Sequence, residues 1–171
     1  GLKEDAKFLL YLVKHPTTNL YVLRPEHPSV NMTTAKADEM VRRAKIGTCA
    51  IADPVKALKA ESKDDRVMAA CALAMYYRWR PAEKMEEVDR PADESKLLLA
   101  ALAEGEWTST GLPDAGNVYA VVHGLGLEAA GWRAVIDTKG KDPAAFNHEA
   151  FKEWLAGKGK DTRVKQLVAK K

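Results

Sequence analysis

The hydrophobic pattern changes character about thirty residues into the chain. Two apolar segments rich in β-forming residues come first, at 8–13 and 20–23, and a turn-like His-Pro-Thr-Thr-Asn stretch separates them. Strands that are apolar almost throughout are typical of strands covered on both faces. The pattern therefore predicts a β hairpin over residues 1–30, ahead of a helical domain over residues 31–171.

A two-stranded hairpin is marginally stable in water by itself, so the predicted hairpin needs a covering partner. It can pack on the helices, pair with another chain through its edge, or form the end of a sheet whose other strands lie upstream. We favour the third arrangement, in which this chain is the C-terminal part of a longer precursor. Pairing through the hairpin edge would instead give a homo-oligomer.

Helical signals follow from residue 33 onward. Capping residues, prolines at first helical positions and glycine stops divide the chain into short segments. The clearest segment begins with a Ser-Lys-Asp-Asp capping pattern at Ser62 and carries an apolar stripe at three- and four-residue spacing as far as Arg78. The predicted helices cover residues 33–46, 53–60, 63–79, 91–104, 113–123 and 147–156, with a last helical turn at 162–168. Residues 83–89 are predicted to be a loop, and residues 132–136 a short strand or buried coil.

Two of these boundaries rest on single residues. Gly47 is predicted to end the first helix, since glycine is common just past a helix end. Asn147 is predicted to cap the helix that follows it, with Phe146 and Phe151 as a hydrophobic staple around the cap.

Two of the predicted helices resemble each other. Residues 65–74 and 94–103 each carry an acid followed by an apolar block that ends in Cys-Ala-Leu-Ala or Ala-Ala-Leu-Ala. The pair resembles the helices of HEAT-type repeats, although its spacing of 29 residues is shorter than the about 40–47 residues of that class. Short connections favour antiparallel neighbours. The predicted fold class is therefore mainly α, with short antiparallel helices stacked in a bundle or HEAT-like arrangement and an N-terminal β hairpin.

The composition is that of a folded domain. The chain has 171 residues, of which 46% are hydrophobic and 30% charged, so it can bury a core. No apolar run reaches the roughly 18 residues of a membrane span. Charged residues at positions 3–5 interrupt any signal-peptide core, so the compartment stays open: secreted or periplasmic if a leader was removed, otherwise cytoplasmic.

Familiar catalytic patterns are missing from the sequence. The four histidines are never paired at a four-residue spacing, no serine stands in a Gly-x-Ser-x-Gly pattern, and the glycines after His123 miss the dinucleotide-binding spacing. The two cysteines, Cys49 and Cys71, are too few for a four-cysteine zinc site and are interpreted as structural. We therefore expect no catalytic residue, cofactor or metal, and favour a non-enzymatic role.

The densest cluster of binding residue types lies at the end of the clearest helix. Tyr76, Arg78, Trp79 and Arg80 combine aromatic rings with guanidinium groups, which can hold a base, a sugar or a carboxylate. A structural explanation also exists, because cations stabilise helix C-termini and aromatic rings cover the end of a core. We take these four as the candidate partner-binding residues.

Positive charge gathers toward residue 171. Residues 152–171 carry a net charge of +5, whereas the rest of the chain carries −2. Such a segment can contact phosphate groups, or it can simply keep the end of a chain solvated. The candidate anion contacts are Lys158, Lys160, Arg163, Lys165, Lys170 and Lys171.

These observations favour a non-enzymatic helical module that binds another protein, as the C-terminal part of a larger precursor or assembly. One alternative is a nucleic-acid-associated protein that uses the basic end. Another is a fragment of an enzyme whose site is completed by missing residues.

Overall fold

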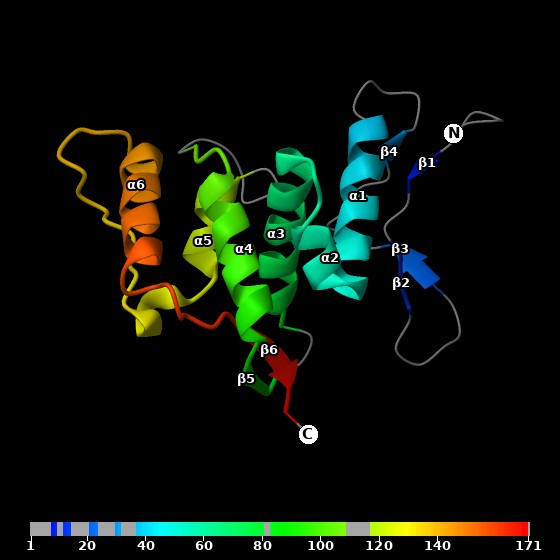
Figure 1. The fold of residues 1–171 in the computed structure, drawn as a ribbon. Helices are drawn as coiled ribbons and strands as arrows, with labels where there is room; N and C mark the ends of the chain where they lie inside the picture. Colours follow the sequence, from blue (N-terminus) through cyan, green and yellow to red (C-terminus); the bar gives the residue numbers. More distant parts are fainter. Residues whose placement is uncertain are drawn as a thin grey trace. The chain divides into compact units, whose positions relative to one another are not determined.

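A computed structural model describes residues 37–80, 83–108 and 117–170, together with the backbone of short strands nearer the start of the chain (Figure 1). The chain divides into two compact units, residues 1–45 and 46–171. Helices predominate among the described residues, and they are accompanied by small antiparallel two-stranded sheets. The predicted mainly helical class is therefore confirmed, whereas the predicted division at residue 30 stays a prediction.

The first unit contains pairs of short antiparallel strands. β2 (Leu12–Lys14) pairs with β3 (Tyr21–Leu23), and β1 (Phe8–Leu9) pairs with β4 (Val30–Asn31). The β2–β3 pair overlaps the two apolar segments at 8–13 and 20–23, and β2 extends one residue beyond the first of them. The segment that joins them lies outside the described residues, and the covering partner of these strands stays a prediction.

Short helices form most of the second unit, and capping side chains set several of their starts. The Asp53 carboxylate accepts a hydrogen bond from the Lys56 backbone N–H (3.2 Å), and the Ser62 hydroxyl accepts one from the Asp65 backbone N–H (3.3 Å). The elements are α1 (Ala37–Ala52), which begins in the first unit, α2 (Pro54–Leu58), α3 (Lys63–Tyr77), β5 (Met85–Asp89), α4 (Ala92–Glu104), α5 (Val118–Gly124), the 3₁₀ helix η1 (Leu127–Ala130), α6 (Pro143–Ala156) and β6 (Lys165–Ala169).

Most of the predicted helices of this unit are found at the expected places. α2, α3 and α4 begin at the predicted caps or within a residue of them, and Gly105 ends α4 as predicted. α5 begins after Asn117, whose side chain accepts a hydrogen bond from the Ala120 backbone N–H (3.2 Å). The start predicted for it at residue 113 lies outside the described residues. Residues 132–136 are coil with Trp132 buried, the second of the two expected forms.

The predicted ends of two helices are wrong. α1 does not stop at Gly47 but continues to Ala52, and the Asp53 backbone N–H extends its pattern by donating to the Cys49 carbonyl (2.9 Å). α6 begins four residues before Asn147, because the Asp142 carboxylate accepts a hydrogen bond from the Ala145 backbone N–H (3.2 Å) and proline occupies the first helical position. Asn147 is therefore a buried residue inside the helix, and Phe146 precedes no cap.

Two further predicted elements of the second unit are also wrong. β5 occupies residues 85–89 of the segment 83–89 that was expected to be a loop, and β6 begins at residue 165 within the segment 162–168 that was expected to be helical. The strands pair antiparallel, with Glu87 opposite Leu167 and Asp89 opposite Lys165. Each strand obtains its backbone hydrogen bonds from a partner about 80 residues away, so neither segment carries a local signal for its structure.

The core of the second unit lies where α3, α4, α5 and α6 pack. α3 contacts both α4 and α5, and α4 contacts α6, as the order of the ribbons shows (Figure 1). Aromatic rings fill the region next to α6: Trp107 stacks on His148 (centroids 5.0 Å apart) and lies beside Phe151 (5.2 Å). Apolar burial in this core is the main stabilising contribution to the unit.

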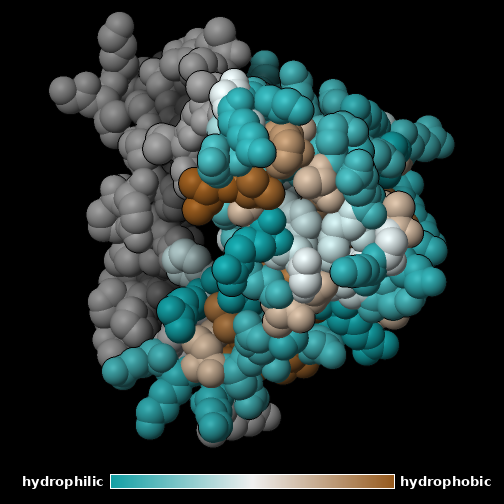
Figure 2. All heavy atoms as spheres, turned by 90° about the vertical axis from the view of Figure 1, so that its left-hand side faces the viewer, coloured by the Kyte–Doolittle hydropathy of each residue, from teal (hydrophilic) through white to brown (hydrophobic). Residues whose placement is uncertain are grey.

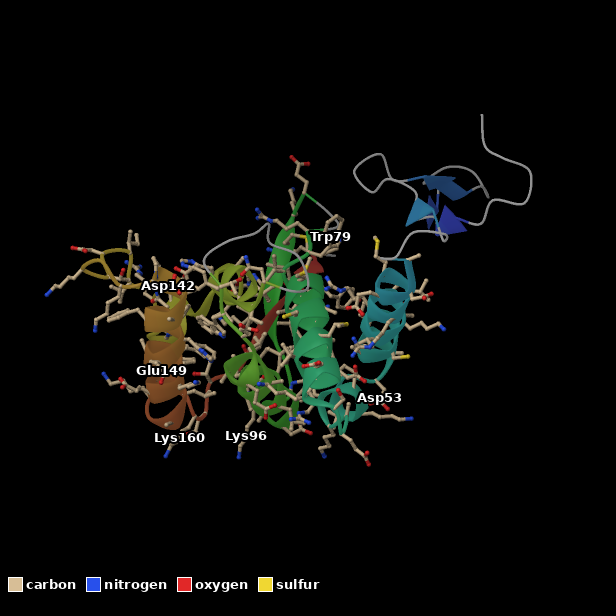
Figure 3. All side chains as sticks on the ribbon, turned by 90° about the horizontal axis from the view of Figure 1, so that it is seen from above. Asp53, Trp79, Lys96, Asp142, Glu149 and Lys160 are labelled. Atoms are coloured by element: carbon tan, nitrogen blue, oxygen red, sulfur yellow. The ribbon has the colours of Figure 1, made fainter. Side chains whose placement is uncertain are left out.

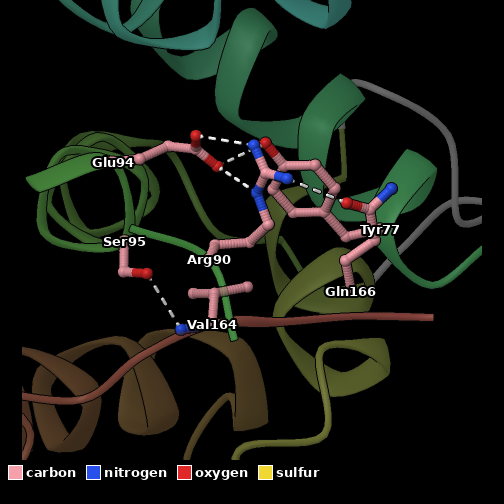
Figure 4. A network of polar contacts seen from close by, with 6 residues as sticks. All are labelled: Tyr77, Arg90, Glu94, Ser95, Val164 and Gln166. Carbon is pink, nitrogen blue, oxygen red and sulfur yellow. Dashed lines mark hydrogen bonds and ion pairs between the residues drawn. The ribbon is translucent and has the colours of Figure 1, made fainter. Parts of the chain in front are cut away.

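A polar network around the buried Glu94 carboxylate joins α3 to α4 through Tyr77 (Figure 4). The Glu94 carboxylate, 3% exposed, accepts two hydrogen bonds from the Arg90 guanidinium (2.8 and 2.9 Å) and one from the Tyr77 hydroxyl (2.5 Å). The guanidinium also lies over the Tyr77 ring, 5.0 Å from its centroid, and donates to the Gln166 side-chain oxygen (3.1 Å). A buried charge with this many partners holds its surroundings in one arrangement.

Backbone contacts of the same network fix the approach to β6. The Val164 backbone N–H donates to the Ser95 hydroxyl (3.0 Å), and the Val164 carbonyl accepts a hydrogen bond from the Arg90 backbone N–H (2.8 Å). Both Ser95 and Val164 are buried. The segment before β6 is therefore attached through its backbone to Arg90 and to the start of α4, in addition to the contact of Gln166 in β6 with Arg90.

The network predicts an alkaline transition. Burial raises the pKa of the Tyr77 hydroxyl, and the hydrogen bond to Glu94 and the negative charge of that carboxylate raise it further. The unfolded chain loses this proton near pH 10 and the folded chain only at higher pH. The stabilisation is therefore complete below about pH 10 and is lost as the pH rises through the folded pKa.

We expect the free energy of unfolding to fall more steeply above about pH 10 in the unmodified chain than in a Tyr77→Phe variant, which lacks the proton. Denaturant titrations at a series of pH values check this. Tyrosinate absorbance gives the control: at about pH 10 the native chain and the variant should absorb equally, and in denaturant they should differ by one tyrosinate. Equal slopes for the two proteins would contradict the prediction.

Candidate functional site

The end of α3 divides the predicted cluster between the core and the surface. The helix ends after Tyr77, and the backbone N–H of Arg78, its C-cap residue, donates to the Ala74 carbonyl (3.2 Å). Tyr77 turns into the core, whereas Tyr76 and Trp79 are 42% and 48% exposed, and Arg80 is exposed. We call Met75, Tyr76, Arg78, Trp79 and Arg80 the α3-end surface, and Trp79 marks it in Figure 3.

Arg78 is the member of this surface that is held in place. Its guanidinium donates to the Glu87 carboxylate of β5 (3.0 Å) and passes close to Gly126, where a Cβ atom would lie 3.3 Å from the guanidinium carbon. Gly126 also has a positive φ of 73°, which favours glycine. The Glu87 carboxylate accepts a second bond from Lys165 (3.2 Å), and the two cations lower the pKa of Glu87, with Arg78 the larger cause.

A hollow of about 240 Å³ lies beside Arg78 and Trp79. Its wall is apolar apart from the Arg78 head group, and α3 and α5 both contribute to it. The exposed side chain of Met75 forms part of the α3 wall. The remaining lining residues are Ala74, Ala120, Val121 and Gly124. An apolar hollow next to a half-exposed tryptophan and a fixed guanidinium can accept a bulky apolar side chain that has an acidic neighbour.

Sequence reasoning identified the α3 side of this hollow but not the α5 side. The α5 residues are small and apolar and belong to an ordinary buried pattern, so they carry no sequence signal for a surface. Met75 follows the three- and four-residue spacing of the apolar stripe that the sequence predicts for this helix, as do Ala70, Cys71 and Ala74. Those three residues are buried, whereas Met75 is 46% exposed.

The candidate anion residues are spread over several elements. Lys158 and Lys160 are exposed in the turn after α6, Lys170 is exposed after β6, and Lys171 lies outside the described residues. Arg163 and Lys165 line a second hollow of about 240 Å³ together with Asp89. Lys165 forms its ion pair with Glu87, as described above.

Acidic residues of β5 lie beside this basic segment. The antiparallel register places Glu86, Glu87 and Asp89 along β6, which contributes one cation, Lys165. The +5 charge counted along the sequence is therefore partly neutralised in space by a strand about 80 residues away.

The segment before α6 presents an apolar tip that the sequence did not single out. Ile136 is 92% exposed. Its neighbour Val135 is fixed by Asn147: the Asn147 side chain accepts a bond from the Val135 backbone N–H (2.7 Å) and donates to the Val135 carbonyl (3.0 Å) and the Pro143 carbonyl (2.8 Å). Asn147 is fully buried, so these bonds replace the water that its amide would otherwise require.

We expect Asn147→Ala to lower the free energy of unfolding by about 2–4 kcal/mol, because it leaves the Val135 backbone N–H and carbonyl without their buried side-chain partner. Chemical denaturation measures the change. Glu149→Ala, at an exposed position two residues further along the same helix, serves as the control. It should change the free energy of unfolding by no more than about 0.5 kcal/mol. A loss for Asn147→Ala as small as that of the control would show that the bonds contribute little.

Metal-binding groups and membrane-spanning helices can be looked for among the residues that the structure describes. Within residues 37–80, 83–108 and 117–170, no group of three or more His, Cys, Asp or Glu side chains is arranged to hold a metal ion. Of the helices described there, none combines the length and the apolar character needed to cross a bilayer. His148 stacks on Trp107 and its Nε2 lies 2.8 Å from the Ala103 carbonyl oxygen, so its surroundings are those of a packed side chain.

Comparisons with protein-family models, with curated proteins and with solved structures gave no match for this chain.

Proposed function

We propose that this chain is a helical module that binds another protein through the α3-end surface. The observation that carries the proposal is the apolar hollow beside Trp79, which has an exposed aromatic ring and an exposed methionine on its rim and a guanidinium fixed by Glu87. Aromatic and arginine side chains next to an apolar hollow are typical of the residues that contribute most to binding at protein interfaces.

The packing of the helices supports this proposal. The contacts of α3 with α4 and α5, and of α4 with α6, are consistent with a HEAT-like stack of short helices. In such a stack each helix contacts mainly its neighbours, and the exposed sides of successive helices form an extended binding surface. We further propose that the N-terminal hairpin forms the joint to an upstream domain of a larger precursor or assembly.

The chemistry of the hollow defines the partner segment that fits it. Its apolar wall favours a bulky apolar side chain, and the exposed Arg80, which follows Trp79 in the chain, favours a carboxylate nearby. Arg78 contributes less net charge than Arg80, because Glu87 already pairs with it. The expected partner is therefore a protein segment with an apolar anchor and acidic flanks.

The basic segment supports nucleic-acid binding less well. Its cations are distributed over several elements, and β5 places three acidic residues beside β6. Nucleic-acid binding depends on several cations that contact neighbouring phosphates together. The protein-binding module is therefore the function that we propose.

We expect Trp79→Ala to abolish capture of the partner protein. Affinity capture from an extract of the source cells, at low and high salt, should give a stoichiometric partner with the unmodified chain and none with the variant. With the purified partner the dissociation constant should rise about 30-fold or more, since an aromatic anchor contributes about 2 kcal/mol or more.

Val88→Ala is the matched control for this experiment. Val88 is 46% exposed on β5, similar to Trp79, but it lines none of the hollows described above. This variant should capture the partner as the unmodified chain does. Circular dichroism and melting temperatures should be nearly unchanged for both variants, and loss of the fold in Trp79→Ala would instead show that Trp79 is a structural residue.

A further inference from the structure

A second concave surface lies along the outer side of α6. It is a hollow of about 390 Å³ whose apolar part is formed by Phe146 with Ala145 and Ala150. These positions follow the three- and four-residue spacing of one helix side. Figure 2 faces this side of the molecule: within its coloured part, white and tan atoms lie among hydrophilic ones. We call this hollow the α6 groove.

Carboxylates dominate the charge of the α6 groove. Asp142, Glu149 and Glu153 line it, against one lining cation, Lys141, and the Lys152 ammonium beside the groove forms an ion pair with Glu149 (2.9 Å). The Lys141 ammonium lies 5.7 Å from the centroid of the Phe146 ring, so this ring already interacts with a cation of its own chain. The groove therefore favours a ligand that combines an apolar or aromatic body with positive charge.

The α3-end surface has the complementary chemistry. It offers the half-exposed Trp79 ring and the exposed Arg80 guanidinium, and its hollow is apolar. In Figures 1 and 3, α4 and α5 lie between α3 and α6, and the label of Trp79 is far from those of Asp142 and Glu149. The two surfaces are therefore separated within one molecule by α4 and α5.

We propose that two copies of this chain associate head to tail, with the α3-end surface of one copy seated on the α6 groove of the next. Trp79 packs on Phe146, and Arg80 pairs with Glu153, because Glu149 already forms an ion pair with Lys152. The contact joins two different surfaces, so each added copy leaves one surface of each kind unused, and the assembly is open rather than closed. This proposal rests on the proposed function, because it uses the same surface and names a second copy as the partner.

The test is sedimentation velocity over a range of protein concentrations. The average mass of the unmodified chain should rise with concentration. Two variants each remove one side of the contact: Trp79→Ala with Arg80→Glu alters the α3-end surface, and Glu149→Lys with Glu153→Lys alters the α6 groove. Each variant alone should show a dissociation constant raised at least about tenfold, because one aromatic anchor and a reversed charge pair are lost.

An equimolar mixture of the two variants gives the decisive result. The first variant keeps an intact α6 groove and the second keeps an intact α3-end surface, so the mixture should form a one-to-one complex that grows no further. Val88→Ala is the control and should associate as the unmodified chain does. A circular dichroism spectrum for each variant establishes that its helices are retained.

Three outcomes overturn the proposal. The first is that the unmodified chain stays monomeric at all concentrations. The second is that association persists in both variants, as it would if it used an edge of the N-terminal strands. The third is that the mixture of the two variants stays monomeric. If the chain is monomeric but captures another protein, and Trp79→Ala abolishes that capture, only a second copy of the chain is excluded as the partner. The proposed function then stands. If Trp79→Ala affects neither association nor capture, both are overturned.

Discussion

The buried carboxylate of Glu94 is the constraint on which the arrangement of the second unit depends. An ionised carboxylate that is 3% exposed requires partners, and Arg90 and Tyr77 supply three hydrogen bonds to it. The desolvation of such a pair offsets much of its attraction, so its net contribution to stability is small, but loss of one partner costs about 3–5 kcal/mol. The network therefore acts mainly to select one arrangement of α3, α4 and β6.

This selection extends to the candidate site. Tyr77 is held by Glu94 inside the core, and the next three residues emerge from the fixed end of α3. Arg78 is then attached to β5 through Glu87, and β5 is itself held by β6. The hollow beside Trp79 is consequently bounded by elements that the buried network has already positioned, so little ordering of this surface is needed when a partner binds.

The sequence predicted the features whose causes are local. Asp53, Ser62 and Gly105 set helix boundaries through neighbours three or four residues away, and the predictions at these points are confirmed. The β5–β6 pairing and the role of Asn147 depend on partners 12 to about 80 residues distant, and a short polar strand or a single asparagine carries no mark of such partners. For the site, the sequence supplied the aromatic and cationic residues of one helix end. It could not supply the α5 wall or the approach of Gly126 to Arg78, because these arise from packing between elements.

The position of β6 has a consequence for the order in which the unit folds during synthesis. The helices α3 and α4 can meet as soon as both have left the ribosome, because their contacts are short-range along the chain. Gln166 and the backbone of Val164, which complete the surroundings of Arg90 and Ser95, are made about 70 residues later. Until then the Arg90 guanidinium, the Ser95 hydroxyl and the edge of β5 lack the hydrogen-bond partners that β6 and Val164 supply. The nascent chain therefore exposes an unpaired strand edge for the several seconds that these residues take to be added, and this edge is the surface on which chaperones or misdirected pairing would act first.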